Sequence, residues 1–446
     1  LIKANLTSEP PVAHDIRAAI LDGGLPEEHP LSPWITNYRK YDPTADDDEA
    51  FNAHGLGVTS AFLFGPIEPG IVTERPYTSV SHIRVLDKQV VNEDPLLLYR
   101  TLGMIEEVLL SHQYQFINLS LGPDLPIEDQ DVHAWTSVID ENLADGNTFM
   151  TIAVGNNGER DRISGNARIQ VPSDCVNAVS TGAADSLGDT WTRAEYSAFG
   201  PGRSPGYIKP DVIAFGGKSG NYFHVLAPGM AANLVPTLGT SFAAPFVLRM
   251  ATGIRAFLGD SISILAIKAL LIHCATQNGH PIEEVGWGKI QENLSALISC
   301  PDGTARIVYQ GELRPGKYLR APIPIPAEQL TGMVTIGATL CFASTTDPED
   351  SGAYTRSGLE ISFRPNKNNF AKKGKTPLSK NDFFIHPSYA SEQELRSDQG
   401  KWETTLSGIK RIRSSSLCEP CFDIHYNARE NGGKSRTRDN IYRRNR

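Results

Sequence analysis

One serine of this chain stands where acyl-transfer chemistry could be built. The segment Leu238-Gly-Thr-Ser-Phe-Ala-Ala-Pro245 places Ser241 at the start of a long apolar helix, after a tight entry at Gly239 and Thr240. The first turn of a helix has free backbone N–H groups and the positive end of the helix dipole. A serine there can expose its hydroxyl while its own N–H points at a developing oxyanion. The alternative is an ordinary N-cap serine, which is common.

A carboxylate and an imidazole precede this serine. Asp22 follows the short apolar run 17–21 and stands before Gly23-Gly24. A doubly wound sheet places its sites at such strand ends, although a turn aspartate before two glycines reads the same way. His54 stands beside Gly55 and is expected to open a short helix, where its ring could meet a neighbouring strand end. A histidine that only caps or packs is the alternative.

The elements that must position these side chains alternate between strand and helix. Apolar runs of strand length end at glycine or asparagine turns, and segments with helical spacing of apolar residues separate them. This alternation predicts an α/β fold with a doubly wound, mostly parallel sheet and helices on both faces. The predicted strands are 17–21, 81–86, 115–122, 148–155 and 178–182, and the main predicted helices cover 97–109, 135–143, 242–257 and 266–273.

The sequence pattern changes near residue 300. Short β-prone segments separated by Pro, Gly, Asp and Asn turns replace the alternation, which predicts a smaller, β-rich, sandwich-like second domain. Residues 364–381 read as a loop, and the last segment has seven basic and two acidic residues. The predicted organisation is an N-terminal arm (1–14), an α/β domain (15–298), a β-rich domain (299–428) and a basic tail (429–446) that is either solvated or a docking arm.

Composition excludes several classes of protein. The chain has 446 residues and a net charge of −9, which argues against a general nucleic-acid binder. It has no apolar run of 18 residues, so we expect no membrane span, and its start at Leu1 shows no signal pattern. Six sparse cysteines favour the cytoplasm. The pair Cys418 and Cys421 could serve metal or redox chemistry but is also typical of ordinary thiols, and no required metal or other cofactor is predicted.

The order of these residues agrees with a known pattern. Asp22, His54, Asn156 and Ser241 follow one another in the order of the subtilisin catalytic triad, with an asparagine between. The chain resembles the subtilisin-like serine peptidases, the subtilase family, over about residues 15–295. The matching pieces are Ile20-Leu-Asp-Gly-Gly24, His54-Gly-Leu-Gly-Val-Thr-Ser-Ala61, Ile117-Asn-Leu-Ser-Leu-Gly122, Ala153-Val-Gly-Asn-Asn-Gly158 and Gly239-Thr-Ser-Phe-Ala-Ala-Pro245.

Two positions depart from the family pattern. The family usually has Thr or Ser after the aspartate, where this chain has Gly23. The family usually has Thr and a second histidine after the His-Gly pair, where this chain has Leu56 and Gly57. Neither departure removes a member of the triad. Both raise a question about local packing and helix geometry.

The resemblance implies a serine endopeptidase that acts on proteins or peptides. Ser241 would be the nucleophile, His54 its general base and Asp22 the residue that holds the imidazole. The Asn156 side-chain amide and the Ser241 N–H would bind the oxyanion. Ser120, Leu121 and Gly122 would pair with the substrate as an added strand. Ala153, Val154 and Gly155 would line the first specificity pocket, and such small residues suggest a roomy one.

The chain is also similar to intracellular bacterial subtilases that are encoded beside an AAA-type ATPase in plasmid-incompatibility or antiphage-defence modules. That likeness rests on residues 57–65, on the β-rich second domain and on the lack of a visible propeptide or signal. It implies a partner ATPase that gates or feeds the protease. The competing interpretation is a catalytically silent subtilase fold that serves as a scaffold or interaction module.

Overall fold

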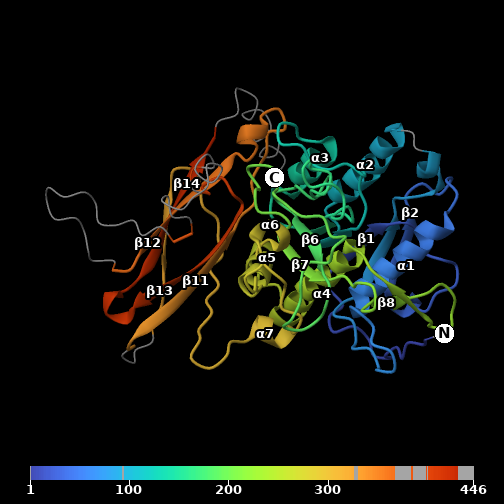
Figure 1. Ribbon diagram of the computed structural model, residues 1–446, viewed down its shortest axis with the longest axis horizontal. Coiled ribbons are helices and arrows are strands. Elements are labelled where there is room, and N and C mark those ends of the chain that lie inside the picture. The colour runs from blue at the N-terminus through green and yellow to red at the C-terminus, as the bar shows by residue number, and fades with distance from the viewer. Residues whose placement is uncertain are drawn as a thin grey trace.

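The computed structural model describes residues 2–92, 95–325, 330–366, 383–384, 398 and 400–429 (Figure 1). Within them, a seven-stranded sheet in the order β2-β3-β1-β4-β5-β6-β7 forms the centre of the first part of the chain. Every neighbouring pair of strands is parallel. The strands are β1 (Ala18–Asp22), β2 (Ile35–Lys40), β3 (Val80–Arg84), β4 (Phe116–Leu119), β5 (Phe149–Ala153), β6 (Val179–Ala184) and β7 (Val212–Phe215).

Two apolar cores lie on the two faces of this sheet. Side chains alternate between the faces along each strand, so Ile20 of β1 joins the core under α1 and α4, whereas Leu21 joins the core under α2 and α3. Helix α4 is buried along most of its length, which explains its continuous apolar sequence. The helices are α1 (Glu49–Phe64), α2 (Pro95–Leu110), α3 (Ala134–Leu143), α4 (Thr240–Leu258), α5 (Ile264–His273), α6 (Ile282–Val285) and α7 (Leu294–Ile298).

The C-terminal part consists of antiparallel strands, which confirms the predicted change of fold class. One sheet has the order β10-β14-β12 and the other pairs β11 with β13. Phe363, Phe383 and Phe422 lie in the small core of this part. Figure 1 shows these strands beside α5, at the opposite end of the molecule from α1. The bounds are β10 (Tyr318–Pro322), β11 (Met333–Cys341), β12 (Ser357–Arg364), β13 (Thr405–Arg413) and β14 (Cys421–Ala428).

A buried polar junction holds the C-terminal part against the first part. Asp140 on α3 accepts hydrogen bonds from the backbone N–H groups of Val176 and Asn177 at 3.0 and 2.8 Å, and from the Tyr354 hydroxyl at 2.9 Å. The Asn177 side chain pairs in both directions with the backbone of Ser344, at 2.9 and 3.0 Å. Burial raises the pKa of Asp140 to about 6 despite these bonds. The junction therefore depends on the hydrogen bonds that the buried Asp140 carboxyl group accepts.

Two expectations from the sequence need correction. Helix α1 does not open at His54 but at Glu49, with the Asp48 side chain as N-cap, so His54 stands in the second turn. The second concerns residues 25–50, whose Pro, Asp and Glu content predicts a loop but which contain β2. This edge strand is mostly exposed and lacks the alternating apolar pattern of a half-buried strand. An antiparallel hairpin of β8 (Phe223–Leu226) and β9 (Leu234–Thr237) completes the approach to α4.

The N-terminal arm pairs with later parts of the chain. Within the predicted arm, Lys3 forms a bridge with Asn233, and Ala13 forms one with Thr78. Most of the loop expected at 364–381 and nearly all of the predicted basic tail lie outside the described residues. In the described part of the chain, no helix is both long and apolar enough to span a membrane.

The junction yields a stability prediction. Tyr354→Phe removes one donor from the buried Asp140 carboxyl and should lower the free energy of unfolding by about 1–3 kcal/mol. Urea unfolding monitored by fluorescence measures the change. Tyr426→Phe is the matched control, because its hydroxyl pairs with Ser357 at 2.8 Å at a half-buried position inside the C-terminal part. Equal losses in the two variants would contradict a special role of the junction.

Candidate active site

The fold brings the predicted site residues to one edge of the central sheet. Asp22 is the last residue of β1, Asn156 follows the end of β5, and Ser241 is in the first turn of α4. His54 reaches the same edge from α1, which packs against both β1 and α4. The carboxyl ends of parallel strands are where open α/β sheets bind their ligands.

Asp22 and His54 are in direct contact. The Nδ1 atom of His54 lies 2.7 Å from Oδ1 of Asp22, and the backbone N–H of Gly23 donates to the same oxygen at 2.7 Å. Since a carboxylate only accepts, the proton of this pair is on Nδ1, and Nε2 of the neutral ring is left as an acceptor. The Asp22 side chain is 1% exposed and that of His54 is 33% exposed. The ring therefore joins a buried carboxylate to the open side of the site.

The electrostatics of this pair favour a charged imidazole. Burial pushes the pKa of His54 down, but the charge of Asp22 and its hydrogen bond push it up more strongly, so the pKa ends above its ordinary value of 6.5. The group is thus a stronger base than a free histidine. The other oxygen of Asp22, Oδ2, is buried and has no hydrogen-bond partner among the described residues.

Ser241 precedes the residue whose ring faces His54, and its hydroxyl is directed to Ser120. The hydroxyl donates to the Ser120 carbonyl at 3.5 Å, and within the described chain no hydrogen bond joins Ser241 to His54. The ring of Phe242, the next residue, has its centroid 5.9 Å from that of His54, so the nucleophile's helix and the imidazole are in contact range. Serine–base hydrogen bonds are often long in unliganded enzymes.

Buried polar groups fix the backbone on which Ser241 stands. The Ser120 hydroxyl donates to the Ser241 carbonyl at 2.9 Å, and the Asn118 amide donates to the Ser120 oxygen at 2.9 Å. The Thr151 hydroxyl on β5 donates to the side-chain oxygen Oδ1 of Asn118 at 2.9 Å. A chain of hydrogen bonds thus runs from two central strands to the first turn of α4.

Asn156 presents its amide nitrogen toward the site. Its Oδ1 atom accepts from the Thr240 N–H at 2.9 Å and from the Thr240 hydroxyl at 3.0 Å. Because the oxygen is occupied on the helix side, the Nδ2 donor remains available at an exposed position beside the start of α4. Side-chain and backbone donors of this kind are what a developing oxyanion requires.

The two predicted substrate-binding segments lie side by side. Ser120-Leu121-Gly122 continues from β4 and Ala153-Val154-Gly155 ends β5, and these strands are paired through Leu119 and Ile152. The sequence interpretation missed Gln170, whose Oε1 lies only 2.3 Å from the point where a Cβ on Gly155 would stand. The Gln170 amide in turn donates to Asp124. A polar side chain therefore occupies the space that the small residues leave.

The two departures from the family pattern have steric reasons. A Cβ at residue 23 would lie 2.2 Å from the Phe51 carbonyl oxygen, so only glycine fits after Asp22. A Cβ at residue 57 would meet the ring of Phe242 at 3.1 Å and Val225 at 3.2 Å, so a side chain there would require these neighbours to move by a few tenths of an ångström. Helix α1 runs unbroken through both glycines of this stretch, which answers the doubt about its geometry.

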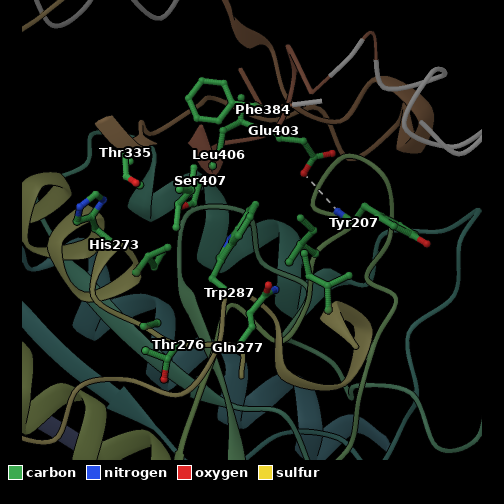
Figure 2. A pocket seen from close by; sticks show the side chains of 17 residues that line it. Tyr207, His273, Thr276, Gln277, Trp287, Thr335, Phe384, Glu403, Leu406 and Ser407 are labelled. Atoms are coloured by element: carbon green, nitrogen blue, oxygen red, sulfur yellow. Dashed lines mark hydrogen bonds between the residues drawn. The ribbon is translucent and has the colours of Figure 1, made fainter. Parts of the chain in front are cut away.

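Neither the pocket beside the C-terminal strands nor the cysteine pair belongs to this site. Figure 2 shows a pocket of about 670 Å³ between the end of α5, Trp287 and the strands β11 and β13, and none of the triad residues lines it. Cys418 is exposed and Cys421 is buried at the start of β14. Among the described residues, no group of three or more His, Cys, Asp or Glu side chains could hold a metal ion.

Comparisons with known proteins identify the family of this chain. A peptidase family profile described as "Subtilase family" matches residues 14–288, more than half of the chain. Among solved structures, a leader-peptide-processing serine protease (EpiP) from Staphylococcus aureus has a TM-score of 0.50 at 17% identity, over 66% of this chain and 78% of that chain. The prenylagaramide maturation protease PagA has a TM-score of 0.46 at 21% identity, over 64% and 92%. No curated protein matches the sequence. This chain belongs to the subtilase family, and it is a serine protease of that family.

Proposed function

We propose that this protease cleaves peptide bonds through a Ser241–His54–Asp22 triad and an acyl-enzyme. Ser241 Oγ would attack the peptide carbonyl while His54 Nε2 takes its proton, and Asp22 would hold the imidazole and stabilise the imidazolium. The observation that carries this proposal is the 2.7 Å contact between His54 Nδ1 and Asp22 Oδ1 beside the first turn of α4. A rotation about the Cα–Cβ bond of Ser241 would turn its hydroxyl from Ser120 to the imidazole.

The oxyanion would form between Asn156 Nδ2 and the Ser241 N–H. Support comes from the orientation of Asn156, whose oxygen is held by Thr240 so that its nitrogen is the free donor. Loss of one oxyanion donor costs about 10²–10³ in kcat, a magnitude known from a subtilisin and therefore from this family. An extended substrate would pair with Ser120-Leu121-Gly122, the segment of irregular backbone that follows β4 at this edge of the sheet.

A covalent probe tests the assignment of the nucleophile. A fluorophosphonate should label the wild-type protein and should leave Ser241→Ala unlabelled, because only an activated serine reacts. Ser261→Ala, at an exposed position after α4, is the control and should label like the wild type. A wild-type protein that stays unlabelled supports the scaffold interpretation instead.

The charge of Asp22 predicts a shift in the pH profile. The working form of His54 is neutral, so activity should rise with pH through a midpoint above 6.5 in the wild type. In Asp22→Asn the burial remains and the attraction is gone, so the pKa of His54 and this midpoint should fall. The rate should also drop about 10⁴-fold, as for a comparable triad change in another serine protease. Label rates between pH 5 and 9 measure both effects, and Asp46→Asn is the exposed control. An unchanged midpoint contradicts the role of Asp22.

Gln170 leads us to propose a short first specificity pocket. Its side chain fills the space beside Gly155, and Asp124 holds it there, with Arg160 donating to Asp124 at 3.0 and 2.8 Å. A long apolar P1 side chain would have to displace this group, whereas a short one would not.

The corresponding variant is Gln170→Ala. It should raise kcat/KM for peptides with P1 Leu or Phe about 10–200-fold relative to P1 Ala, since pocket contacts of this size are worth about 1–3 kcal/mol. Gln277→Ala, which removes an amide bonded to Gly286 far from the site, should leave the ratio unchanged. Equal preference in the wild type and in Gln170→Ala would refute the short pocket.

We extend the proposal to regulation by a partner ATPase in a bacterial, intracellular defence or plasmid-competition module. The resemblance of residues 57–65 suggests it, and the position of the Ser241 hydroxyl away from His54 supports it. The fluorophosphonate label, applied with and without the ATPase encoded beside the gene, tests this. Labelling at the same rate in both samples would end the regulatory proposal and leave the triad intact.

A further inference from the structure

Strand β3 carries two buried polar side chains next to the catalytic aspartate. β3 pairs with β1 in parallel, with His82 beside Ile20 and Arg84 beside Asp22. His82 is 0% exposed and Arg84 is 1% exposed. Residues two apart on a strand point to the same face, so both side chains lie on the side of the sheet covered by α1. Buried polar side chains of this size need partners that justify their burial.

His82 bridges the turn after Asp22 to the helix that carries His54. Its Nε2 atom lies 2.6 Å from the Gly23 carbonyl oxygen, and its Nδ1 atom lies 2.8 Å from the Thr59 hydroxyl. Thr59 is fully buried on α1, one turn and a half after His54. The ring of Tyr38 covers His82 from the β2 side, with centroids 5.8 Å apart.

The protonation state of His82 fixes the direction of both bonds. Burial lowers the pKa of His82 to about 4, so the ring is neutral near pH 7. The charge of Asp22 acts in the opposite direction and His29 adds to the lowering; these are the titratable groups that influence the ring. A carbonyl oxygen only accepts, so the single proton is on Nε2, and Nδ1 is an acceptor. The one hydrogen of the Thr59 hydroxyl is within hydrogen-bond distance of both Nδ1 and the Gly55 carbonyl oxygen, each at 2.8 Å, so Thr59 joins His82 to the backbone beside His54.

The Asp22 carboxylate and His82 contact opposite backbone groups of one residue, Gly23. The Gly23 N–H donates to the same Asp22 oxygen that contacts His54, and Gly23-Gly24 is a flexible pair with no side chain to fix it. A hydroxyl residue cannot take this place, because a Cβ at residue 23 would strike the Phe51 carbonyl oxygen. The backbone N–H groups of Val85 and Leu86 hold the Asp22 carbonyl, which is in the same peptide group as the Gly23 N–H. The hydrogen bond from His82 holds the Gly23 carbonyl, in the following peptide group, and so limits rotation about the Gly23 backbone.

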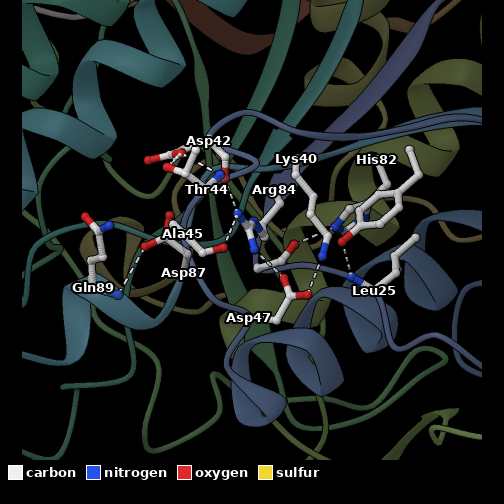
Figure 3. Close-up of polar contacts among 12 residues, drawn as sticks. Leu25, Lys40, Asp42, Thr44, Ala45, Asp47, His82, Arg84, Asp87 and Gln89 are labelled. Carbon is white, nitrogen blue, oxygen red and sulfur yellow. Dashed lines mark hydrogen bonds and ion pairs between the residues drawn. The ribbon is translucent and has the colours of Figure 1, made fainter.

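The strand itself is anchored to the segment that starts α1. Figure 3 shows Arg84 between the Asp47 carboxylate, with which it forms an ion pair, and the backbone carbonyls of Asp42 and Ala45. The next residue, Asp48, caps the N-terminus of α1. β3 therefore contacts the turn after Asp22 and Thr59 of α1 through His82. Through Arg84 it also contacts the segment just before α1.

We propose that His82, supported by Thr59, is a positioning residue that aligns the Asp22 carboxylate with His54. It stands in place of the hydroxyl residue that other subtilases have after the aspartate. Its hydrogen bonds go to neither Ser241 nor the Asp22 carboxylate, so it acts through the backbone of Gly23, whose carbonyl it holds and whose N–H donates to Asp22. The proposal rests on the proposed triad, because alignment matters only if Asp22 and His54 act in the reaction.

The experiment measures the second-order rate of fluorophosphonate labelling against pH, together with thermal stability. His82→Leu keeps most of the volume but removes the donor to Gly23, so the rate should fall about 10-fold or more and its pH midpoint should move down. The midpoint moves because a misaligned Asp22, the carboxylate that faces His54, raises the pKa of His54 less. His82→Gln places an amide donor near the Nε2 position and should restore the rate to within about 3-fold of the wild type.

A second pair of variants makes the test independent of whether His82→Leu folds. Thr59→Val removes the donor to Nδ1 at nearly constant volume and should shift the midpoint in the same direction, whereas Thr59→Ser should restore it. A purely structural role would lower the melting temperature and leave the midpoint of the folded protein in place, and that result overturns the proposal. If the wild type itself does not label, the triad assignment fails instead, so the two failures are distinguishable.

Discussion

The whole site depends on how closely α1 approaches the end of β1. A Cβ on Gly55 would lie 2.4 Å from the Gly24 carbonyl oxygen and 2.9 Å from that of Gly23, distances at which no side chain can exist. Because residue 55 is glycine, the helix backbone rests directly on the turn, and His54 can bring Nδ1 to within 2.7 Å of Asp22. The contact between an imidazole and a buried carboxylate is thus the result of backbone packing, and the glycines are its condition.

This packing has a cost that other elements offset. Glycines at residues 23 and 24 remove the side-chain donors and the stiffness that the turn after Asp22 would otherwise have. Compensation comes from buried polar groups on neighbouring strands: His82 on β3 for the aspartate, and the Thr151–Asn118–Ser120 chain on β4 and β5 for the serine. Polar networks of this kind stabilise one geometry only when every member is satisfied. Buried side chains on the central strands therefore hold the site in place.

The sequence predicted the parts whose physical signal is local. Short stretches of chain indicated the buried helix after Gly239 and the apolar strands that end in glycine turns, and the structure has these elements. The four candidate side chains were each recognised from such a stretch and from their order. Edge strand β2 escaped prediction because its side chains are mostly exposed, so no alternation of apolar residues marks it. His82 could be suspected only from a polar residue inside an apolar run. Its role follows from the register of β3 against β1, and Gln170 matters through its distance to Gly155. Contacts of this kind are set by tertiary packing, which a single sequence does not reveal.

The C-terminal sheets are connected to Ser241 through packed helices. β11 packs on α5, α5 packs on α4, and the first turn of α4 carries Ser241. A partner that binds the C-terminal part thus has a continuous path of packed elements to the nucleophile, two helices long. Such a path transmits an effect only if some element on it has two states that the partner distinguishes. The Ser241 hydroxyl contacts the Ser120 carbonyl at 3.5 Å, and it would supply such a pair of states if rotation about its Cα–Cβ bond brought it to His54. Regulation through the C-terminal part would then require a change in one side-chain torsion and no large movement of the backbone.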